Sequence, residues 1–301
     1  MKAFVTGGAG FIGSHLTDSL IEMGADVHVI DNLSSGNQDY LNPTATLHQT
    51  DIKDPSIIEL IAAHKPDYIF HLAAQADVNR STASPSEDLK TNLTGTVNLL
   101  EGCRRSPVKK FIFASTSAVY GNNTAKKLTE QSPVKPISFY GSSKAAAEMY
   151  INLYSEFFSI PYSILRYGNV YGPRQTAKGE GGVIAVFLEK LMKNERLKVN
   201  GDGRQTRDFI YVQDIVDANI AASLHEGNDT FHISTGTTTS ILELIDLLKE
   251  LHPSPIEYDH SEDRIGDIKH SCLANTKAKK ALKWKPTHSI AEGLSKTYAS
   301  K

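Results

Sequence analysis

The sequence predicts an α/β fold built on a doubly wound parallel sheet, with a smaller C-terminal domain. Segments with strand-like and helix-like patterns alternate through roughly the first half of the 301 residues. Such alternation is typical of parallel sheets covered by helices on both faces. A glycine-rich turn joins the first expected strand to the first expected helix, as in βαβ units that open this class of fold.

The expected elements of the first half follow from hydrophobic periodicity. Short apolar or β-branched runs predict strands, and apolar residues at helical spacing predict helices. The expected strands are 2–6, 25–30, 46–49, 67–72, 110–114 and 162–165. The expected helices are 11–23, 55–63, 85–103 and 138–158.

The pattern loosens after residue 166, where glycines crowd a stretch that precedes an expected helix over 183–193. We therefore expect a domain of residues 1–165 and a smaller domain of 166–301, with parts of about 207–233 returning to the first. The remaining expected strands lie near 198–199 and 208–211. The remaining expected helices lie near 213–225, 241–251, 276–282 and 288–298.

Composition excludes several classes of protein. Hydrophobic residues make up 40% and charged residues 22%, which is ordinary for a globular chain. The formal charge is −2 with no long run of one sign, so neither nucleic acid nor a membrane surface is an expected partner. No apolar run approaches the roughly 18 residues of a membrane-spanning helix. Two cysteines suit a cytoplasmic protein with reduced thiols.

Glycines in the first turn predict a dinucleotide site of the Rossmann type. Gly7, Gly10 and Gly13 are spaced G-x-x-G-x-x-G between an expected strand and an expected helix. This arrangement allows a tight turn, close approach of backbone to a pyrophosphate and close packing of helix on strand. Asp31 ends the second strand, where a carboxylate holds the adenosine ribose and repels a 2′-phosphate, so the sequence favours NAD over NADP. Asp51 and Ile52 follow the third strand and are expected near the adenine.

Tyr140 and Lys144 are the expected catalytic pair. Residues at i and i+4 share one face of a helix. A nearby ammonium and a nicotinamide cation both lower the pKa of a tyrosine, which then removes a proton from a substrate hydroxyl during hydride transfer. Ser115 and Thr116 end the preceding strand, whose carboxyl end faces the cofactor crevice. His71 also ends a strand there, but we expect it to be structural.

These motifs together resemble the extended short-chain dehydrogenases/reductases, and among them the UDP-glucose 4-epimerase group. The resemblance runs almost the full length of the chain, over 6–13, Asp31, Asn32, Asp51, Ile52, 71–75, Asn92, 115–121, 140–144, 166–173, 201–203, Arg207, Asp208 and 264–267.

The resemblance implies the roles of individual residues. Thr116, Tyr140 and Lys144 match the catalytic positions. The implied substrate contacts are Thr116, Tyr140, Asn169, Arg207, Arg264, Asp267 and Ser271, with the two arginines on the diphosphate. The implied cofactor contacts are Gly7, Gly10, Phe11, Ile12, Gly13, Asp31, Asn32, Asp51, Ile52, Leu72, Ala73, Ala74, Asn92, Ser115, Tyr140, Lys144 and Tyr167.

The implied activity is NAD-dependent 4-epimerisation of UDP-glucose and UDP-galactose through a 4-keto intermediate, in a homodimer with tightly bound NAD. A small residue at Ser271 further implies acceptance of UDP-GlcNAc and UDP-GalNAc. UDP-glucuronate or UDP-xylose 4-epimerisation is an alternative, and an inactive NAD-sensing protein is an alternative of a different class. Ser117 and Ala118 stand where 4,6-dehydratases have an acid and a base, which argues against dehydration. Histidine spacing indicates no metal site.

Overall fold

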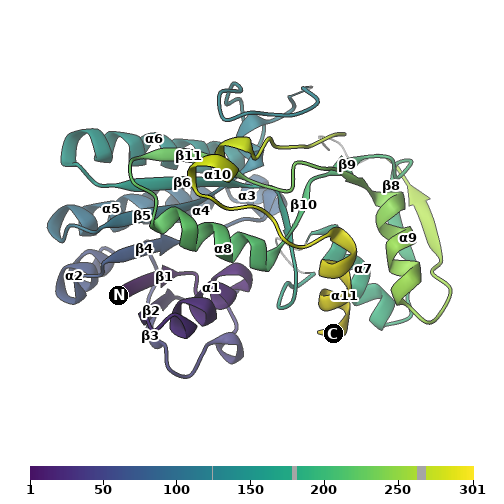
Figure 1. Cartoon of the computed structure of the whole chain (residues 1–301), viewed down its shortest axis with the longest axis horizontal. Helices are drawn as coiled ribbons and strands as arrows, with labels where there is room; N and C mark the ends of the chain where they lie inside the picture. The colour runs from purple at the N-terminus through teal and green to yellow at the C-terminus, as the bar shows by residue number, and fades with distance from the viewer. Residues whose placement is uncertain (124, 178–181, 263–268) are drawn as a thin grey trace.

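A central seven-stranded parallel sheet organises the chain. The computed structural model describes residues 1–123, 125–177, 182–262 and 269–301 (Figure 1). The strand order is β11-β6-β5-β4-β1-β2-β3, which confirms the predicted doubly wound sheet. The order reverses between β1 and β4, and ligands bind beyond the carboxyl ends of strands at such a point. The strands are β1 (Lys2–Thr6), β2 (Asp26–Asp31), β3 (Thr46–Gln49), β4 (Tyr68–His71), β5 (Lys110–Thr116), β6 (Tyr162–Tyr167) and β11 (Asp229–Ile233).

Helices cover both faces of this sheet because its strands are apolar on both sides. Along β1, Ala3 and Val5 belong to one hydrophobic cluster and Phe4 to another, as expected for side chains that alternate between faces. The first cluster lies beneath α1 (Phe11–Glu22), α8 (Val212–Ser223) and α10 (Thr276–Ala281). The second lies beneath α2 (Ser56–His64), α5 (Gly95–Arg105) and α6 (Phe139–Phe158). None of the helices in the described ranges is long and apolar enough to cross a membrane.

The helix predicted over 85–103 is interrupted. The structure has α4 (Pro85–Leu89), a π-helical turn (Lys90–Thr94) and then α5. Close packing accompanies the interruption: a Cβ on Gly95 would lie 2.6 Å from Ile52 Cδ1. The helix α3 (Val78–Ala83) was not predicted, although the Asp77 side chain caps it by accepting from the Asn79 and Arg80 amides.

A smaller lobe lies at one end of the molecule, where Figure 1 groups α7, α9, α11, β8 and β9. It has its own hydrophobic cluster, and three strand pairs run through it: β7 with β10, β9 with β12, and β8 with β13. Its helices are α7 (Val183–Met192), α9 (Ile241–Leu251) and α11 (Ile290–Ala299). Its strands are β7 (Asn169–Tyr171), β8 (Leu197–Asn200), β9 (Thr206–Arg207), β10 (Phe209–Tyr211), β12 (Thr239–Ser240) and β13 (Tyr258–Ser261).

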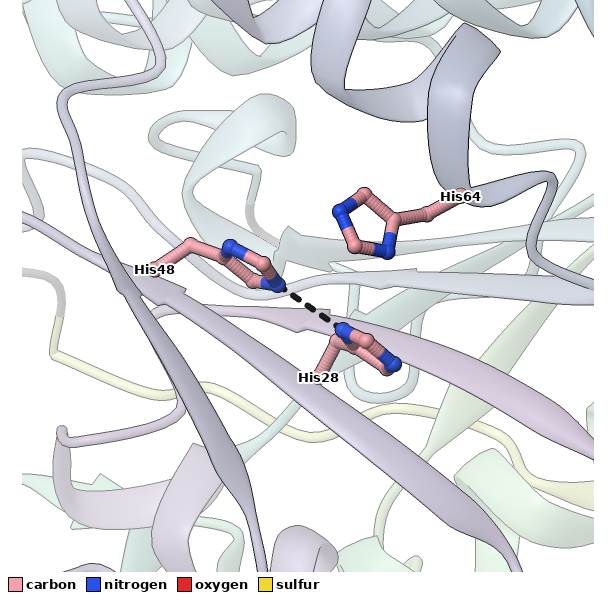
Figure 2. A group of neighbouring side chains, drawn as sticks. All are labelled: His28, His48 and His64. Carbon is pink, nitrogen blue, oxygen red and sulfur yellow. Dashed lines mark hydrogen bonds between the residues drawn. The ribbon is translucent and has the colours of Figure 1, made fainter.

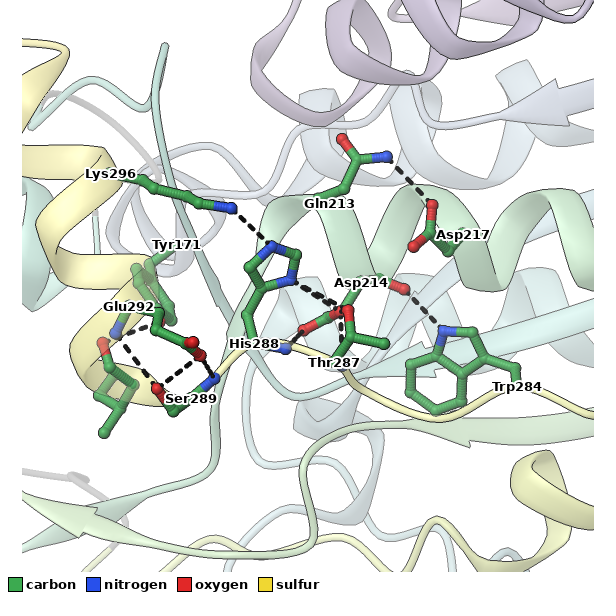
Figure 3. A network of polar contacts seen from close by, with 11 residues as sticks. Tyr171, Gln213, Asp214, Asp217, Trp284, Thr287, His288, Ser289, Glu292 and Lys296 are labelled. Carbon is green, nitrogen blue, oxygen red and sulfur yellow. Dashed lines mark hydrogen bonds and ion pairs between the residues drawn. The ribbon is translucent and has the colours of Figure 1, made fainter.

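Asp214, a fully buried residue of α8, holds the chain segment that leads from α10 to α11 in the smaller lobe (Figure 3). Its carboxylate accepts hydrogen bonds from the Thr287 amide and hydroxyl, both at 2.9 Å. Its backbone carbonyl accepts from Trp284 Nε1 at 3.0 Å. Ser289 and Glu292 then form a capping box that starts α11. The last helix of the smaller lobe is thereby anchored to a helix of the main sheet.

We expect acid to destabilise the fold through His232 on β11, a fully buried residue. Burial, with the nearby charge of Arg166, lowers the pKa of His232 to about 3. Between that value and the unfolded pKa of about 6.5, the unfolded chain binds a proton that the folded chain does not, so stability falls as pH falls. This one residue is expected to lower the free energy of unfolding by about 2 kcal/mol at pH 5 relative to pH 7.

Urea unfolding at pH 7 and pH 5 tests this for the unaltered chain and for His232→Gln. The variant is expected to be less stable than the unaltered chain at both pH values. The difference between its free energies of unfolding at pH 7 and pH 5 should be smaller by about 2 kcal/mol. An equal pH dependence in both proteins would exclude His232 as the source.

Candidate active site

The turn between β1 and α1 packs so tightly that it requires glycine at two positions. Gly7 has a φ of +70°, and a Cβ there would lie 2.8 Å from the Ala73 nitrogen. A Cβ on Gly13 would lie 2.1 Å from the Gly7 carbonyl oxygen, so only glycine allows this packing of helix on turn. Helix α1 begins at Phe11, and the unpaired amides of a helix's first turn form an anion site.

A cleft above the carboxyl ends of the strands brings together nearly all of the residues expected to contact the cofactor. The predicted residues that line it are Gly7, Gly10, Phe11, Ile12, Gly13, Asp31, Asn32, Asp51, Ile52, Leu72, Ala73, Ala74, Ser115, Tyr140, Lys144 and Tyr167. The structure adds residues that sequence reasoning missed. Among them are Thr50 and the loop residues Ser34, Ser35 and Gly36. The small polar residues that follow Asp31 in the sequence could have indicated this loop.

Asp31 is held in place by the backbone around it. Its carboxylate accepts from the Ala9 amide at 3.0 Å and from the Leu33 amide at 2.9 Å. The side chain still lines the cleft. A fixed carboxylate at the end of β2 fits the ribose of NAD, and the glycine turn fits its pyrophosphate.

Asn92, an expected cofactor contact, is buried beside the cleft and does not line it. Its amide nitrogen donates to the Gln75 carbonyl at 2.9 Å and to Ser143 Oγ at 3.0 Å. Its amide oxygen accepts from the Gln75 backbone at 2.8 Å. These bonds join the loop after β4 to α6, so Asn92 positions the cleft wall, and its neighbour Thr91 lines the cleft.

Helix α6 begins so that Tyr140 and Lys144 face the cleft. Ser138 caps the helix by accepting from the Gly141 amide at 3.0 Å. A Cβ on Gly141 would lie 2.7 Å from the Ala118 carbonyl oxygen, so the first turn packs directly on the segment after β5. Lys144 is buried, with its ammonium 4.1 Å from the centre of the Phe113 ring.

A second cavity, of about 860 Å³, adjoins this helix start. It is lined by the predicted substrate residues Thr116, Tyr140, Asn169, Arg207 and Ser271. Tyr140 lines both this cavity and the cofactor cleft, so its hydroxyl-bearing side chain lies where the two meet. Two further predicted substrate residues, Arg264 and Asp267, lie outside the described residues.

A shift of the chain by one residue would place His270 or Cys272 at the cavity in place of Ser271. The backbone hydrogen bonds of this segment show which of the three lines it. The Ser271 amide donates to the Thr206 carbonyl at 3.2 Å. His270 is exposed and contacts the Thr206 hydroxyl at 3.0 Å. Cys272 is buried, and the buried Asp208 accepts from the next amide, that of Leu273, at 3.3 Å. Ser271 is therefore the residue of the three that lines the cavity.

His71 is fully buried between two hydroxyl groups. Its Nδ1 lies 2.8 Å from Thr6 Oγ1, and its Nε2 lies 2.9 Å from Thr96 Oγ1. Burial, aided by the charge of Lys144, lowers the pKa of His71 well below its usual value. The neutral ring joins β4 to β1 and α5, as expected of a structural histidine.

Comparison with known proteins identifies the family. The pattern of the NAD dependent epimerase/dehydratase family matches residues 3–234. The chain belongs to this family. It is 43% identical to the putative UDP-glucose 4-epimerase of Methanocaldococcus jannaschii over 96% of this chain and 95% of that one. Membership confirms NAD as the cofactor and accounts for the cleft lined by the glycine turn.

Solved structures of epimerases superpose closely on the whole chain. UDP-glucose 4-epimerase from Thermotoga maritima, solved with UDP-glucose, has a TM-score of 0.95 at 44% identity and covers 100% of this chain and 98% of its own. UDP-glucose 4-epimerase from Thermus thermophilus, solved with NAD, has a TM-score of 0.94 at 35% identity with the same coverage.

Similar structures also include 4-epimerases of other sugars. The UDP-N-acetylglucosamine 4-epimerase of Methanobrevibacter ruminantium has a TM-score of 0.95 at 35% identity, covering 99% of this chain and 97% of its own. The UDP-glucuronic acid 4-epimerase of Bacillus cereus has a TM-score of 0.91 at 31% identity, covering 100% of this chain and 98% of its own. Inversion at C4 is common to these relatives, while the sugar differs.

Proposed function

We propose that the chain interconverts UDP-glucose and UDP-galactose by NAD-dependent inversion at C4. The observation that carries this proposal is the position of Tyr140 between the cofactor cleft and the cavity lined by Thr116, Asn169 and Arg207. A base at this junction reaches both a sugar hydroxyl and the hydride acceptor. The named relatives that are most similar in sequence support the same reaction.

Each catalytic side chain has a distinct task in this reaction. Tyr140 removes the proton of the C4 hydroxyl and later returns it to the reduced sugar. Lys144, one helical turn along α6, provides the positive charge that favours the phenolate. Thr116 accepts from the Ala118 amide at 3.1 Å, which orients its hydroxyl at the cavity wall beside Tyr140. NAD held by the glycine turn and Asp31 would supply the acceptor and donor of the C4 hydride, so the cofactor would not be consumed and is expected to stay bound.

The diphosphate is assigned to the end of the cavity near β9. Arg207 lies on β9, which pairs with β12 in the smaller lobe, and its side chain lines the cavity. A guanidinium pairs with two phosphate oxygens at once, which fixes the orientation of the nucleotide. Arg264 and Asp267 remain predictions for the second phosphate contact and the uridine ribose.

Two other functions, dehydration of the sugar and NAD sensing without catalysis, are less well supported. The small residues Ser117 and Ala118 line the cavity and have no carboxyl group to move the protons of dehydration. An inactive NAD sensor would not need the Tyr140–Lys144 pair, which is intact. UDP-glucuronate and UDP-xylose stay alternative substrates, and a panel of UDP-sugars assayed for C4 inversion separates them.

We expect the chain to accept UDP-GlcNAc and UDP-GalNAc as well, because Ser271 is small and lines the cavity. The 2-acetamido group needs room that a bulky residue would fill. Ser271→Tyr should therefore reduce activity on the N-acetylated pair at least about tenfold while sparing UDP-galactose. A change of this size is typical when the shape of a pocket distinguishes two similar substrates. Product analysis by chromatography measures both activities.

His270→Tyr is the matched control, since it places the same ring on the exposed neighbouring residue. It should leave both activities unchanged. Absence of activity on UDP-GalNAc in the unaltered enzyme, or equal loss of both sugars in Ser271→Tyr, would contradict the role of Ser271.

We propose a homodimer formed through α6. Met149, Leu153 and Phe157 recur every four residues on this helix and are 66%, 46% and 71% exposed. Such a stripe of large apolar side chains is characteristic of a surface that another chain covers. The two-fold dimer is the commonest homo-oligomer, and it places the same surface patch of both subunits against each other.

Light scattering at micromolar concentration should therefore give the mass of a dimer, and Leu153→Glu with Phe157→Glu should give a monomer. The control is Leu224→Glu, because Leu224 is 68% exposed and lies at the end of α8. A monomeric unaltered chain, or a dimer that survives the double substitution, would contradict the assignment.

We also propose a cytoplasmic location. Cys103 and Cys272 are buried and form no disulfide, which accords with a reducing compartment.

A further inference from the structure

Three histidines from separate elements meet at the edge of the central sheet, away from the cofactor cleft. His28 lies on β2, His48 on β3, and His64 is the last residue of α2 (Figure 2). One ring nitrogen of each lies within 4.8 Å of the others. They are separated by 20 and 16 residues in the chain, so sequence spacing did not indicate them. His28 is three residues before Asp31, about 10 Å along the strand from the cleft.

Strand register and helix docking bring the three rings together. His28 is the partner of Phe4 on β1, and His48 is the partner of Ile30 on β2. Because strand side chains alternate, His28 and Ile30 share the face that α2 covers. The Phe4 ring lies beneath all three imidazoles, at 5.1 to 5.9 Å between ring centres. The site is therefore backed by apolar core on one side.

We propose that His28, His48 and His64 form a site for a divalent transition-metal ion of the zinc class, held by three imidazoles and one water. Three neutral imidazoles with one open position are a known zinc ligand set. Imidazole favours zinc, copper and nickel over magnesium and calcium. This inference is independent of the proposed epimerase activity.

The geometry within the cluster already approaches that of a metal site. His28 Nδ1 lies 2.8 Å from His48 Nε2, so one proton is shared between two ligand nitrogens. In a tetrahedral zinc site, with bonds of about 2.0 to 2.1 Å, ligand nitrogens are about 3.3 Å apart. His28 and His48 need to separate by about half an ångström. The His64 nitrogen lies within 4.8 Å of the other two and needs to move closer to them. The metal ion takes the place of the shared proton, and the donor ring then carries that proton on its other nitrogen, so both imidazoles bind as neutral ligands.

Neighbouring groups favour the ligand form of these histidines. Burial lowers the pKa of both His28 and His48, which keeps the rings neutral. His28 Nε2 lies 3.5 Å from an Asp26 carboxylate oxygen, on the side of the ring away from His48. A carboxylate behind a metal-binding histidine fixes its tautomer and orientation. The Lys2 ammonium also lies nearby, 3.8 Å from Asp26, so its repulsion of a cation is partly compensated.

Zinc binding by the full chain tests the proposal directly. Protein stripped with a chelator is titrated with ZnCl₂ by calorimetry, and retained metal is measured by mass spectrometry after gel filtration. We expect one bound Zn²⁺ per chain and a rise of a few degrees in melting temperature, because a ligand of the folded state stabilises it. Mg²⁺ should do neither. Co²⁺ should bind with the visible absorption of a tetrahedral nitrogen site.

Matched variants identify the ligands. His64→Gln and His48→Gln should each weaken zinc binding at least about tenfold, and Asp26→Asn by about tenfold as a residue that orients a ligand. His260→Gln removes an exposed histidine from the smaller lobe and should change nothing. Circular dichroism checks that each variant is folded. No zinc binding at 100 µM, or equal affinity in His64→Gln and His260→Gln, would overturn the proposal and leave the proposed epimerase function untouched.

Discussion

Substitution of Tyr140 by phenylalanine is expected to lower epimerase activity at least about a hundredfold, the range for loss of a general base. The change removes a single hydroxyl group. Among the described residues, Tyr140 is the only tyrosine that lines both the cofactor cleft and the cavity of the expected substrate residues. The phenylalanine ring still fills the same space, and therefore folding and NAD binding should be retained.

The assay couples formation of UDP-glucose from UDP-galactose to a dehydrogenase, and bound nucleotide is measured separately after denaturation. Tyr150→Phe is the matched control, because Tyr150 lies on the same helix and is 43% exposed. It should leave activity unchanged. Activity of Tyr140→Phe within a few-fold of the unaltered enzyme would exclude the assigned role.

Substitution of Glu148 by glutamine should destabilise the fold by about 3–5 kcal/mol, the cost of leaving a buried charge without its partner. Glu148 on α6 and Arg166 on β6 are 7% and 8% exposed and form a two-pronged ion pair. Ser115 donates to the same carboxylate, and Arg166 also donates to the Tyr120 hydroxyl. A glutamine amide would direct its own N–H groups at those of Arg166.

This ion pair also connects the elements that carry the catalytic residues, since Ser115 precedes Thr116 and α6 carries Tyr140. The unfolding free energy at pH 7, from urea titration, measures the effect. Glu59→Gln is the control, because it breaks an ion pair with Arg105 in which both side chains are more than half exposed. Exposed pairs contribute about 0 to 1 kcal/mol. A loss for Glu148→Gln no larger than that of the control would contradict the expectation.

Features that depend on local sequence could be predicted. The glycine turn, the Asp31 carboxylate and the Tyr140–Lys144 pair each lie within one short segment, where chain geometry alone sets which groups are neighbours. The strands of the first half were also predicted, because most are short runs of mainly apolar residues. Most of the predicted cofactor residues then meet at one edge of the sheet, because parallel strands place their carboxyl ends together.

Features that depend on tertiary contacts could not be predicted. The apolar period over 85–103 indicated one helix, but packing around Gly95 and the hydrogen bonds of Asn92 accompany a π-helical turn. Asn92 was expected at the cofactor from the family resemblance, and its hydrogen bonds to Gln75 and Ser143 could not be anticipated because those residues are distant in sequence. The histidine cluster on β2, β3 and α2 likewise exists only once the strands pair in register.

The central claim, that the chain inverts C4 by removing and returning the same hydride, is tested most directly in D₂O. Purified enzyme is incubated with UDP-galactose and NAD, and the product is analysed by proton NMR. We expect UDP-glucose that keeps ordinary hydrogen at C4, because the hydride never exchanges with solvent. No UDP-glucose at micromolar enzyme, or UDP-glucose carrying deuterium at C4, would contradict the claim.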